Sequence, residues 1–297
     1  MTHLIIMLAS ISVVGFIVGG TILYLTRPRK RGHGISLLVP FRTDNGRRAE
    51  TWQWLARYWQ HELPGAEIVI GTDNHPAFCK TAAVNRAADK AKGDVFVILD
   101  ADCYVSGEVI EYCANEIRRE RKRGNRLWFI PYRYFYRLTD PASREILNSN
   151  PGNPARFFAA PPPNHKLQET KGITRAHWFG ALIQIMPREA FYAAGTMDNR
   201  FHGWGGEDVA FMHALDTLYS RHKTVPSGVI HLWHPTIGSS AKDRKWAGQT
   251  KPGANGNLAA KYFRARGDAG RMRELVTNRS AIAAIEPPKT DIALSAK

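Results

Sequence analysis

Apolar and polar residues alternate along the chain in blocks that predict strands and helices in turn. Three short apolar runs predict buried strands, at residues 35–41, 67–71 and 94–99. Between them, residues 48–61 place aromatic and leucine side chains at helical spacing, and the alanine-rich segment 79–92 also predicts a helix. Strand, helix, strand, helix and strand in succession imply right-handed crossovers, and therefore a parallel sheet in an α/β fold.

The rest of the chain continues this alternation less regularly. We expect further strands at 127–136, 179–186 and 229–233, and further helices at 107–123, 188–194, 207–218 and 257–276. Residues 138–173 are rich in Pro, Asn and Gly, which predicts a long loop, and loops of that length are usually functional or mobile.

The N-terminal stretch predicts a membrane anchor. From Leu4 to Thr26 the chain carries no charge, and these 23 residues would span about 34 Å as a helix at ~1.5 Å per residue, enough to cross a bilayer core. Basic residues follow at 27–31 and only Met-Thr-His precedes, so the positive-inside rule predicts a cytoplasmic body. The alternative, a cleaved signal peptide, would have a basic start and a shorter apolar run.

Charge and cysteine content restrict the partners. The 297 residues include 41 Lys and Arg against 26 Asp and Glu, a formal net charge of +15. This excess favours an anionic partner: nucleic acid, an acidic membrane surface or a phosphorylated small molecule. Cys79, Cys103 and Cys113 form no CxxC pair, which argues against a disulfide framework and a thiolate zinc site.

Asp100-Ala101-Asp102 follows the most strand-like run of the chain. Ligands of parallel sheets bind beyond the carboxyl ends of the strands, where the loop containing Asp73 also falls. Two carboxylates one residue apart are costly unless a cation lies on them, and Mg²⁺ or Mn²⁺ bridging to a diphosphate suits this arrangement. The alternative is a solvated turn, in which Asp is common.

A histidine pair follows the last predicted strand. His231 and His234 are three residues apart, so both imidazoles can reach one ion if the chain turns between them. With Asp102 they would form a set of oxygen and nitrogen ligands that fits Mn²⁺ better than Ca²⁺. The alternative is a pair of surface or packed histidines.

The segment Phe201–Phe211, FHGWGGEDVAF, combines three glycines with a tryptophan and two carboxylates. The glycines allow the backbone to lie against a ligand and a loop to change conformation, and Trp204 offers a flat face for a sugar ring. Asp208, next to Glu207 at a predicted helix start, is a carboxylate able to accept a hydroxyl proton. The alternative, a glycine turn with an acidic helix cap, needs one carboxylate and no tryptophan.

These motifs, taken in order over residues 35–236, resemble those of metal-dependent nucleotide-sugar glycosyltransferases of the GT-A fold. The resemblance is to the inverting β-1,4-galactosyltransferase-like group (family 7 C-terminal domain) and to the family 2 group. The shared motifs are Pro40-Phe41-Arg42, Phe78 with Asn85 seven residues later, Asp100 with Asp102, Gly203 to Asp208, and His231 with His234. The resemblance implies a Rossmann-like, three-layer α/β fold with a mostly parallel central sheet.

The resemblance also implies a role for each residue. The nucleotide sugar would be held by Pro40, Phe41, Arg42, Asp73, Phe78, Asn85, Asp100, Ala101 and Asp102, with Asp73 at the uracil and Asp100 at the ribose or the ion. Mn²⁺, or Mg²⁺, would be held by Asp102, His231 and His234. The acceptor and sugar would contact Trp204, Gly205, Gly206 and Glu207, and Asp208 would be the catalytic base.

The implied reaction transfers a sugar from a UDP-sugar to a hydroxyl of a protein, glycan or glycolipid acceptor, with inversion. A retaining polypeptide-type sugar transferase of the same fold stays open as an alternative, and it would need no base. A basic nucleic-acid or membrane-surface protein is the alternative from another class, supported by the cluster Arg118–Arg126. The chain has no helix-turn-helix or zinc-finger pattern, so we expect no nucleic-acid partner.

This assignment divides the chain into four parts: a membrane anchor with its basic flank (1–32), a GT-A catalytic domain (33–240), a basic C-terminal extension packed on that domain (241–282) and a disordered tail (283–297). Two features depart from the group. The first residue of its metal pair is often Met and is His231 here, which we expect to change the metal preference, and the disulfides of its secreted members are absent.

Overall fold

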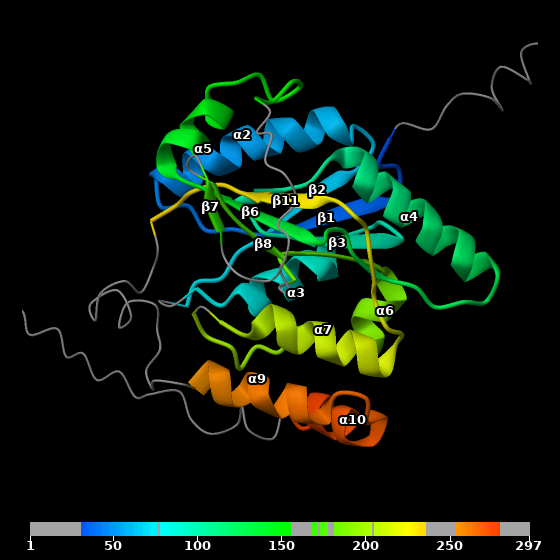
Figure 1. Ribbon diagram of the computed structural model, residues 1–297. Helices are drawn as coiled ribbons and strands as arrows, with labels where there is room; N and C mark the ends of the chain where they lie inside the picture. Colours follow the sequence, from blue (N-terminus) through cyan, green and yellow to red (C-terminus); the bar gives the residue numbers. More distant parts are fainter. Residues whose placement is uncertain are drawn as a thin grey trace, which may run out of the picture.

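The computed structural model describes residues 31–75, 78–155, 168–170, 173–177, 181–203, 205–235 and 254–279. They form two sheets with helices packed around them (Figure 1). Within these ranges no helix is long and apolar enough to cross a membrane. The predicted anchor at Leu4–Thr26 and the predicted tail at 283–297 lie outside the described residues.

The larger sheet has six strands in the order β10-β5-β9-β3-β1-β2. They are β1 (Ile35–Pro40), β2 (Glu67–Gly71), β3 (Val95–Leu99), β5 (Phe129–Ile130), β9 (Ile183–Pro187) and β10 (Lys223–Thr224). β1 pairs in parallel with both β2 and β3, so the carboxyl ends of these three strands share one edge of the sheet. Every residue of β1 and β3 is buried, as expected for apolar strands covered on both faces.

The sheet is mixed because of one strand, β9. This strand runs antiparallel to both β3 and β5. The other three pairings of this sheet are parallel, so β9 is the exception within the mostly parallel arrangement that the resemblance implies.

The smaller sheet has the order β4-β11-β6-β8-β7. Its strands are β4 (Cys103–Tyr104), β6 (Tyr134–Leu138), β7 (Gln168–Thr170), β8 (Ile173–His177) and β11 (Gly228–His231). β11 pairs antiparallel with β4 and places His231 opposite Cys103. This register brings the end of β11 beside the loop that follows β3.

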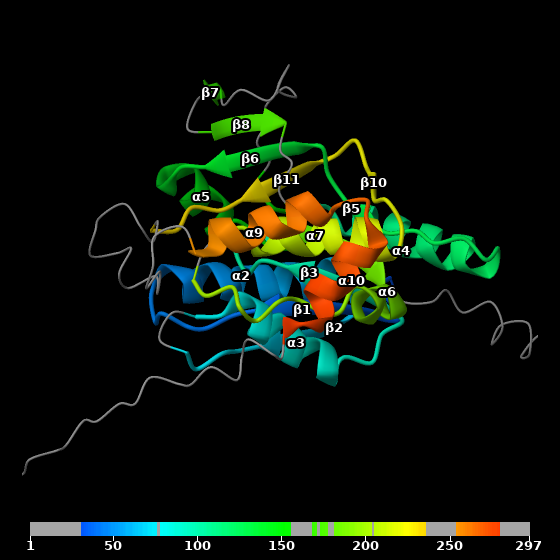
Figure 2. The same ribbon diagram turned by 90° about the horizontal axis from the view of Figure 1, so that it is seen from below.

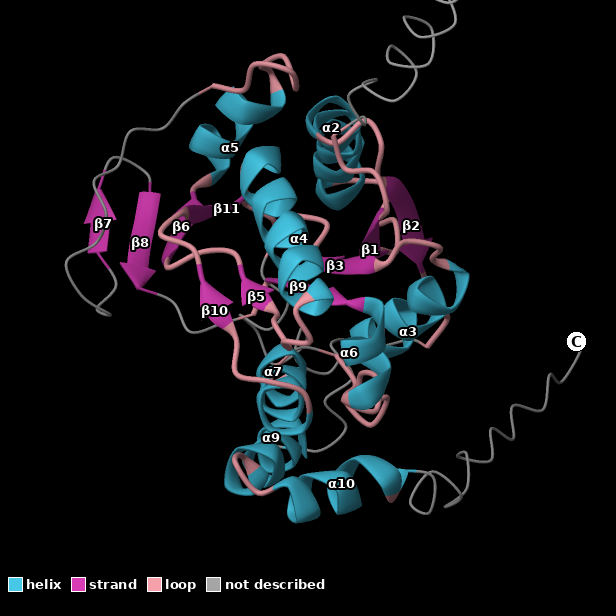
Figure 3. Cartoon of the chain, turned by 90° about the vertical axis from the view of Figure 1, so that its right-hand side faces the viewer, coloured by secondary structure: helices cyan, strands magenta, loops and turns pink. Residues whose placement is uncertain are grey.

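Helices cover both faces of the larger sheet (Figures 1 and 3). α2 (Arg47–Glu62) and α4 (Gly107–Lys122) lie on one face, and α3 (Lys80–Lys90), α6 (Arg188–Ala193) and α7 (Glu207–Leu218) lie on the other. α9 (Ala254–Ala265) and α10 (Ala269–Thr277) pack against α7 as an outer layer, which is seen from below in Figure 2.

Two predicted segments are interrupted in the structure. The strand predicted at 127–136 becomes β5 and β6 because Pro131, which has no N–H for a strand ladder, lies between them. The single helix predicted at 257–276 becomes α9 and α10. They are separated by a turn in which Gly267 has φ +77°, a conformation that ends helices.

The long loop predicted at 138–173 is wrong in part. It contains helix α5 (Asp140–Leu147) and strand β7, while residues 156–167 lie outside the described part of the chain. Pro141 occupies the first turn of α5, where proline favours helix initiation instead of breaking the helix. Composition alone cannot show whether a proline starts a helix or breaks one.

Candidate active site

Three predicted metal ligands from separate parts of the chain come together at the carboxyl edge of the larger sheet. Nε2 of His231 lies 3.9 Å from Oδ1 of Asp102, and Nε2 of His234 lies 3.4 Å from Oδ2 of the same carboxylate. The N–H of Leu232, between the two histidines, donates to the Asp102 carbonyl oxygen at 2.8 Å. This backbone bond fixes both imidazoles against the loop after β3.

The charge states of these side chains suit cation binding. Burial lowers the pKa of His231 to about 4, against the opposing effect of Asp102, so its imidazole is neutral at pH 7. Burial would raise the pKa of Asp102, but the charges of His231, His234 and Arg48 outweigh it and hold that pKa at about 2. The site therefore offers an ionised carboxylate and a neutral imidazole, the forms in which both bind metals.

The donor set fits a divalent metal ion. Two atoms that each lie about 2.0–2.2 Å from one ion are no more than ~4.4 Å apart, a condition that both the His231 and the His234 distances to Asp102 satisfy. Sγ of Cys103 also lies within 4.8 Å of ligand atoms of Asp102 and His231. Burial and the adjacent carboxylates raise the pKa of Cys103, so this thiol stays protonated. Carboxylate oxygen and imidazole nitrogen suit Mn²⁺.

Lys80, which belongs to none of the sequence motifs described above, links the Asp-Ala-Asp motif to the start of α7. Nζ of Lys80, the first residue of α3, lies 2.5 Å from Oδ1 of Asp100 and 2.8 Å from Oδ1 of Asp208. The two carboxylates follow β3 and begin α7, respectively, and Lys80 is 13% exposed between them. One buried cation thus neutralises part of the charge of both acids.

Burial and mutual charge shift the pKa values of this group. The pKa of Lys80 is raised because Asp100, Asp208 and Glu207 outweigh the burial that would lower it, so the lysine stays protonated. The pKa of Asp208 is raised first by burial and then by the charges of Glu207 and Asp100, with Lys80 opposing. A carboxylate with a raised pKa is a stronger base than an exposed aspartate.

The glycine segment forms the turn that precedes α7. Gly205 and Gly206 have φ values of +117° and +88°, in the region that L side chains rarely adopt. A Cβ on Gly206 would lie 2.8 Å from Cβ of Ala259 in α9. The buried carboxylate of Glu207 accepts a hydrogen bond from the Gly205 N–H at 3.0 Å. Trp204 lies outside the described residues.

The predicted nucleotide-binding residues form a second cluster at the end of β1. Pro40 ends the strand, and the ring of Phe41 packs 5.9 Å from that of Trp52. The guanidinium of Arg42 lies over the ring of Phe78, at 5.3 Å from its centroid. Nη1 of Arg42 also donates to the carbonyl oxygen of His75 at 2.7 Å, which joins this cluster to the loop after β2.

Asp73 lies in that loop and is buried. Its Oδ2 accepts hydrogen bonds from the N–H groups of His75 and Cys79, both at 3.0 Å, and its Oδ1 accepts one from Arg86 at 2.9 Å. Burial opposes ionisation, but these donors outweigh it and lower the pKa of Asp73. The carboxylate therefore organises its own loop.

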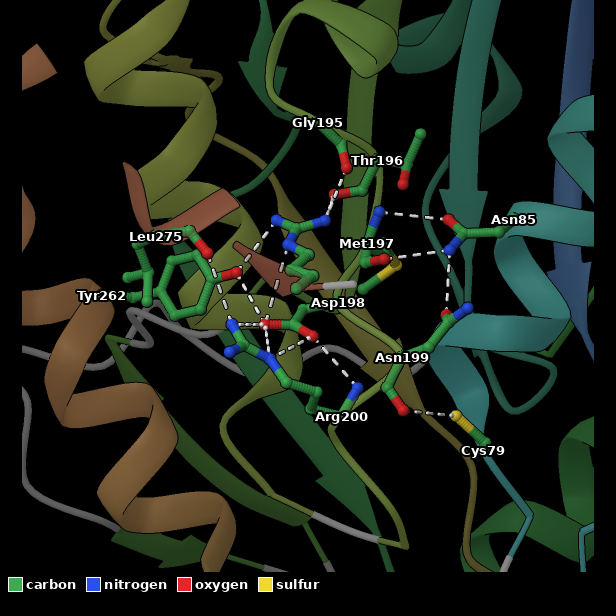
Figure 4. A network of polar contacts seen from close by, with 11 residues as sticks. Cys79, Asn85, Gly195, Thr196, Met197, Asp198, Asn199, Arg200, Tyr262 and Leu275 are labelled. Atoms are coloured by element: carbon green, nitrogen blue, oxygen red, sulfur yellow. Dashed lines mark hydrogen bonds and ion pairs between the residues drawn. The ribbon is translucent and has the colours of Figure 1, made fainter. Parts of the chain in front are cut away.

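Asn85 is in contact with the segment before the glycine turn. Its Nδ2 donates to the Met197 carbonyl oxygen and to Oδ1 of Asn199, both at 2.9 Å, and its Oδ1 accepts from the Met197 N–H at 3.0 Å. On the other side of the same segment, the side chain of Asp198 contacts Arg200 and Tyr262, as Figure 4 shows. Asn85 thus connects α3 to the chain that leads into α7.

Asp198 is the centre of a buried polar network that attaches α9 and α10 to this segment (Figure 4). Its Oδ2 lies 2.7 Å from Nη2 of Arg200 and accepts a hydrogen bond from Tyr262 of α9 at 2.8 Å. Arg279 donates to the Thr196 carbonyl oxygen at 3.1 Å and to the Tyr262 hydroxyl at 2.9 Å. Burial opposes ionisation, but the Arg200 contacts and the Tyr262 bond outweigh it and lower the pKa of Asp198.

The loop after β2 and the glycine turn are in direct contact. The rings of His75 and His202 lie 4.8 Å apart, and Asn255 of α9 donates to the His202 carbonyl oxygen at 2.9 Å. The cluster of predicted nucleotide-binding residues and the turn that precedes Asp208 are thereby joined through two imidazoles.

Comparison with known families shows what part of the chain is similar to. Residues 42–182 match the model of glycosyl transferase family 2. This segment contains the aspartates of the Asp-Ala-Asp motif and Lys80. The match covers just under half of the chain and shows a similarity to this glycosyltransferase family. The matched segment ends before the glycine turn and the histidine pair, so Asp208, His231 and His234 belong to the candidate site by their geometry and not by this match.

Two curated proteins are similar to about half of the chain. Human chondroitin sulfate N-acetylgalactosaminyltransferase 2 is 31% identical over 150 residues, which are 48% of this chain and 24% of the relative. The mouse protein of the same name matches equally. The chain therefore spans about a quarter of the length of the curated relatives it matches.

Solved structures give more distant similarities. The Pyrobaculum calidifontis mannosyltransferase PcManGT, in complex with GDP-Man and Mn²⁺, aligns with 94% of this chain and 87% of its own, at 13% identity and a TM-score of 0.40. The catalytic domain of Drosophila β1,4-galactosyltransferase 7, in complex with xylobiose, covers 74% of this chain and 81% of its own, at 14% identity and a TM-score of 0.35.

The sequence contained one signal for Lys80. A cation is unfavourable in the first turn of a helix because the helix dipole is positive there, yet Lys80 begins an otherwise good alanine-rich helix. A lysine in that position needs a compensating anion. In the structure Lys80 has two, Asp100 and Asp208.

Proposed function

We propose that this protein is a glycosyltransferase, which transfers a sugar from a UDP-sugar to an acceptor hydroxyl with inversion at the anomeric carbon. Two sets of side chains at one edge of the sheet carry the proposal. One set is Asp102, His231 and His234, and the other is Asp208 with its ion-pair partner Lys80. An inverting transfer needs a cation at the diphosphate and a base at the acceptor.

The side chains of Asp102, His231 and His234 would hold a divalent ion, Mn²⁺ or Mg²⁺. When bound, this ion supplies positive charge that stabilises the departing nucleoside diphosphate. Arg48 adds a fixed positive charge beside it, since its Nη2 lies 3.4 Å from Nδ1 of His234. Arg42 and Phe78 supply a cation and an aromatic face at the end of β1 for the nucleotide.

Asp208 would accept the proton of the attacking hydroxyl. Its raised pKa favours proton uptake, and Lys80 holds the carboxylate in place at 2.8 Å. The hydrogen bond from the Gly205 N–H to Glu207 fixes the turn that precedes the base. The acceptor would lie against this glycine segment. The acceptor would be a hydroxyl of a protein, glycan or glycolipid.

The first donor to test is UDP-N-acetylgalactosamine, because the curated relatives are named as N-acetylgalactosaminyltransferases. The test is a hydrolysis screen of nucleotide sugars with and without Mn²⁺, which needs no acceptor. We expect UDP release that depends on the metal. Equal release from all donors without metal would contradict the proposal.

Asp208→Asn separates the inverting mechanism from the retaining alternative. A general base contributes about 10²–10⁴-fold, so the variant should lose transfer by that factor and keep UDP binding. Asp216→Asn, at the other end of α7, is the control and should transfer at the normal rate. The anomeric configuration of the product, measured by NMR, gives an independent answer: retained configuration would exclude the role of Asp208.

A further inference from the structure

We propose that this protein has a second anion site, a basic pocket at the end of α7 remote from Asp208, which binds a phosphate group. The group would be presented either by a soluble phosphate compound or by a lipid headgroup. The pocket has a volume of about 540 Å³. Its lining residues are Arg121, Gly124, Asn125, Arg126, Glu189, Ala193, Leu218, Tyr219 and Arg273.

The pocket is separate from the catalytic carboxylates. α7 begins at Glu207, beside Asp208, and reaches the pocket with its last residue, Leu218. At ~1.5 Å per residue, this helix places about 16 Å between the two sites. α4 likewise begins five residues after Asp102 and contributes Arg121 from its last turn. None of the residues assigned to sugar transfer lines this pocket.

Three arginines from different segments face one acid across the pocket. Arg121 lies 3.6 Å from Glu189 and 3.2 Å from Asp94, so its charge is shared with two carboxylates. Arg126, after α4, and Arg273, on α10, are exposed and make no ion pair within the described part of the chain. Two guanidinium groups therefore remain without a counterion in one concavity.

The geometry favours a small ligand that carries a phosphate. The guanidinium of Arg126 lies over the ring of Tyr219, at 5.5 Å from its centroid, which restricts its orientation. A guanidinium presents paired N–H donors that match phosphate oxygens, and such charge-assisted bonds are stronger than neutral ones. Ala193 and Leu218 add apolar surface, and the volume falls within the ~300–1,000 Å³ typical of small-molecule pockets.

The test compares the full chain with a variant that carries Arg126→Ala and Arg273→Ala. Arg264→Ala, which removes an exposed arginine of α9 outside the pocket, is the charge control. The soluble probe is inorganic pyrophosphate, measured by calorimetry in the presence of a chelator so that metal-dependent binding at the catalytic site is suppressed. We expect the double variant to bind pyrophosphate at least ~10-fold more weakly than the control.

The lipid source is tested with vesicles of phosphatidylglycerol mixed in phosphatidylcholine, compared with phosphatidylcholine alone. If the pocket binds a headgroup, the double variant should lose the preference for anionic vesicles that the wild type and Arg264→Ala show. Loss of pyrophosphate binding with an unchanged vesicle preference assigns the site to a soluble phosphate. If the double variant matches the control with both probes, the arginines only compensate helix-end carbonyls and the proposal is wrong. Unchanged circular dichroism and donor hydrolysis show that the variants are folded.

Discussion

The ammonium group of Lys80 lies 2.8 Å from a carboxylate oxygen of Asp208, although 128 positions separate the two residues in the chain. The same ammonium lies 2.5 Å from Asp100. Lys80 begins α3 and Asp208 lies in the first turn of α7, so the starts of two helices on one face of the sheet are joined by a buried ion pair. The contact connects the Asp-Ala-Asp motif after β3 with Asp208, the proposed base.

Lys80→Met should therefore affect both stability and catalysis. Removing one partner of a buried ion pair costs about 3 kcal/mol, because the remaining charges are left uncompensated. Without the ammonium, the pKa of Asp208 should rise further and the carboxylate should be protonated, so we expect the rate of transfer to fall at least ~100-fold. Urea unfolding and steady-state kinetics measure the two effects.

Two further variants distinguish this ion pair from a general loss of packing. Lys90→Met removes an exposed lysine from the same helix and should change neither quantity. Adding Asp208→Asn to Lys80→Met removes one of the uncompensated carboxylates, so the double variant should be more stable than Lys80→Met alone. Additive destabilisation would show that the two side chains are not coupled.

The sequence predicted local elements well where the local pattern determines them. β1, β2 and β3 lie within a residue or two of the predicted runs, because each is a continuous apolar run bounded by polar turns. The direction of β9 could not be predicted in this way. It depends on pairing with β3 and β5, which are formed by residues more than 50 positions away.

In the candidate site, too, the sequence indicates residues that belong to a local pattern and does not indicate those that depend on distant partners. His231 and His234 could be selected because their spacing at a strand end is itself a pattern, and the pairing of β11 with β4 brings them to Asp102. Lys80 depends on partners 20 and 128 positions away, which no local pattern records. Asn85 matches a motif, yet its hydrogen bonds go to the 197–199 segment and not to the residues around Arg42.

His234→Ala should weaken metal dependence. The variant removes one imidazole from the proposed ligand set and leaves Asp102 and His231 in place. We expect the Mn²⁺ concentration for half-maximal activity to rise at least ~10-fold, with maximal activity partly restored by excess metal. His61→Ala, which removes an exposed histidine at the end of α2, should leave the Mn²⁺ titration unchanged. An identical titration for His234→Ala would remove this residue from the ligand set.

Asp198→Asn should destabilise the protein in a pH-dependent manner. The network lowers the pKa of Asp198 from the ordinary value of 3.8, so the ionised form contributes stability above that pH. This contribution is lost as the pH falls through the folded-state pKa. The variant should therefore be less stable than wild type at pH 7, and the difference should shrink below pH 3.8. Urea unfolding across this range measures it, and a difference that stays constant with pH would contradict the assignment.

Gly71→Ala should separate β2 from α3. A Cβ on Gly71 would lie 1.8 Å from the Ala83 carbonyl oxygen and 2.7 Å from its carbon, and these backbone atoms cannot move without the helix. We expect a loss of about 3 kcal/mol in unfolding free energy, with lower activity because α3 carries Lys80. Gly256→Ala is the control: a Cβ there meets nothing within 4 Å, and alanine in a helix should stabilise by about 0.5–1 kcal/mol. Wild-type stability in Gly71→Ala would show that β2 and α3 are not in close backbone contact.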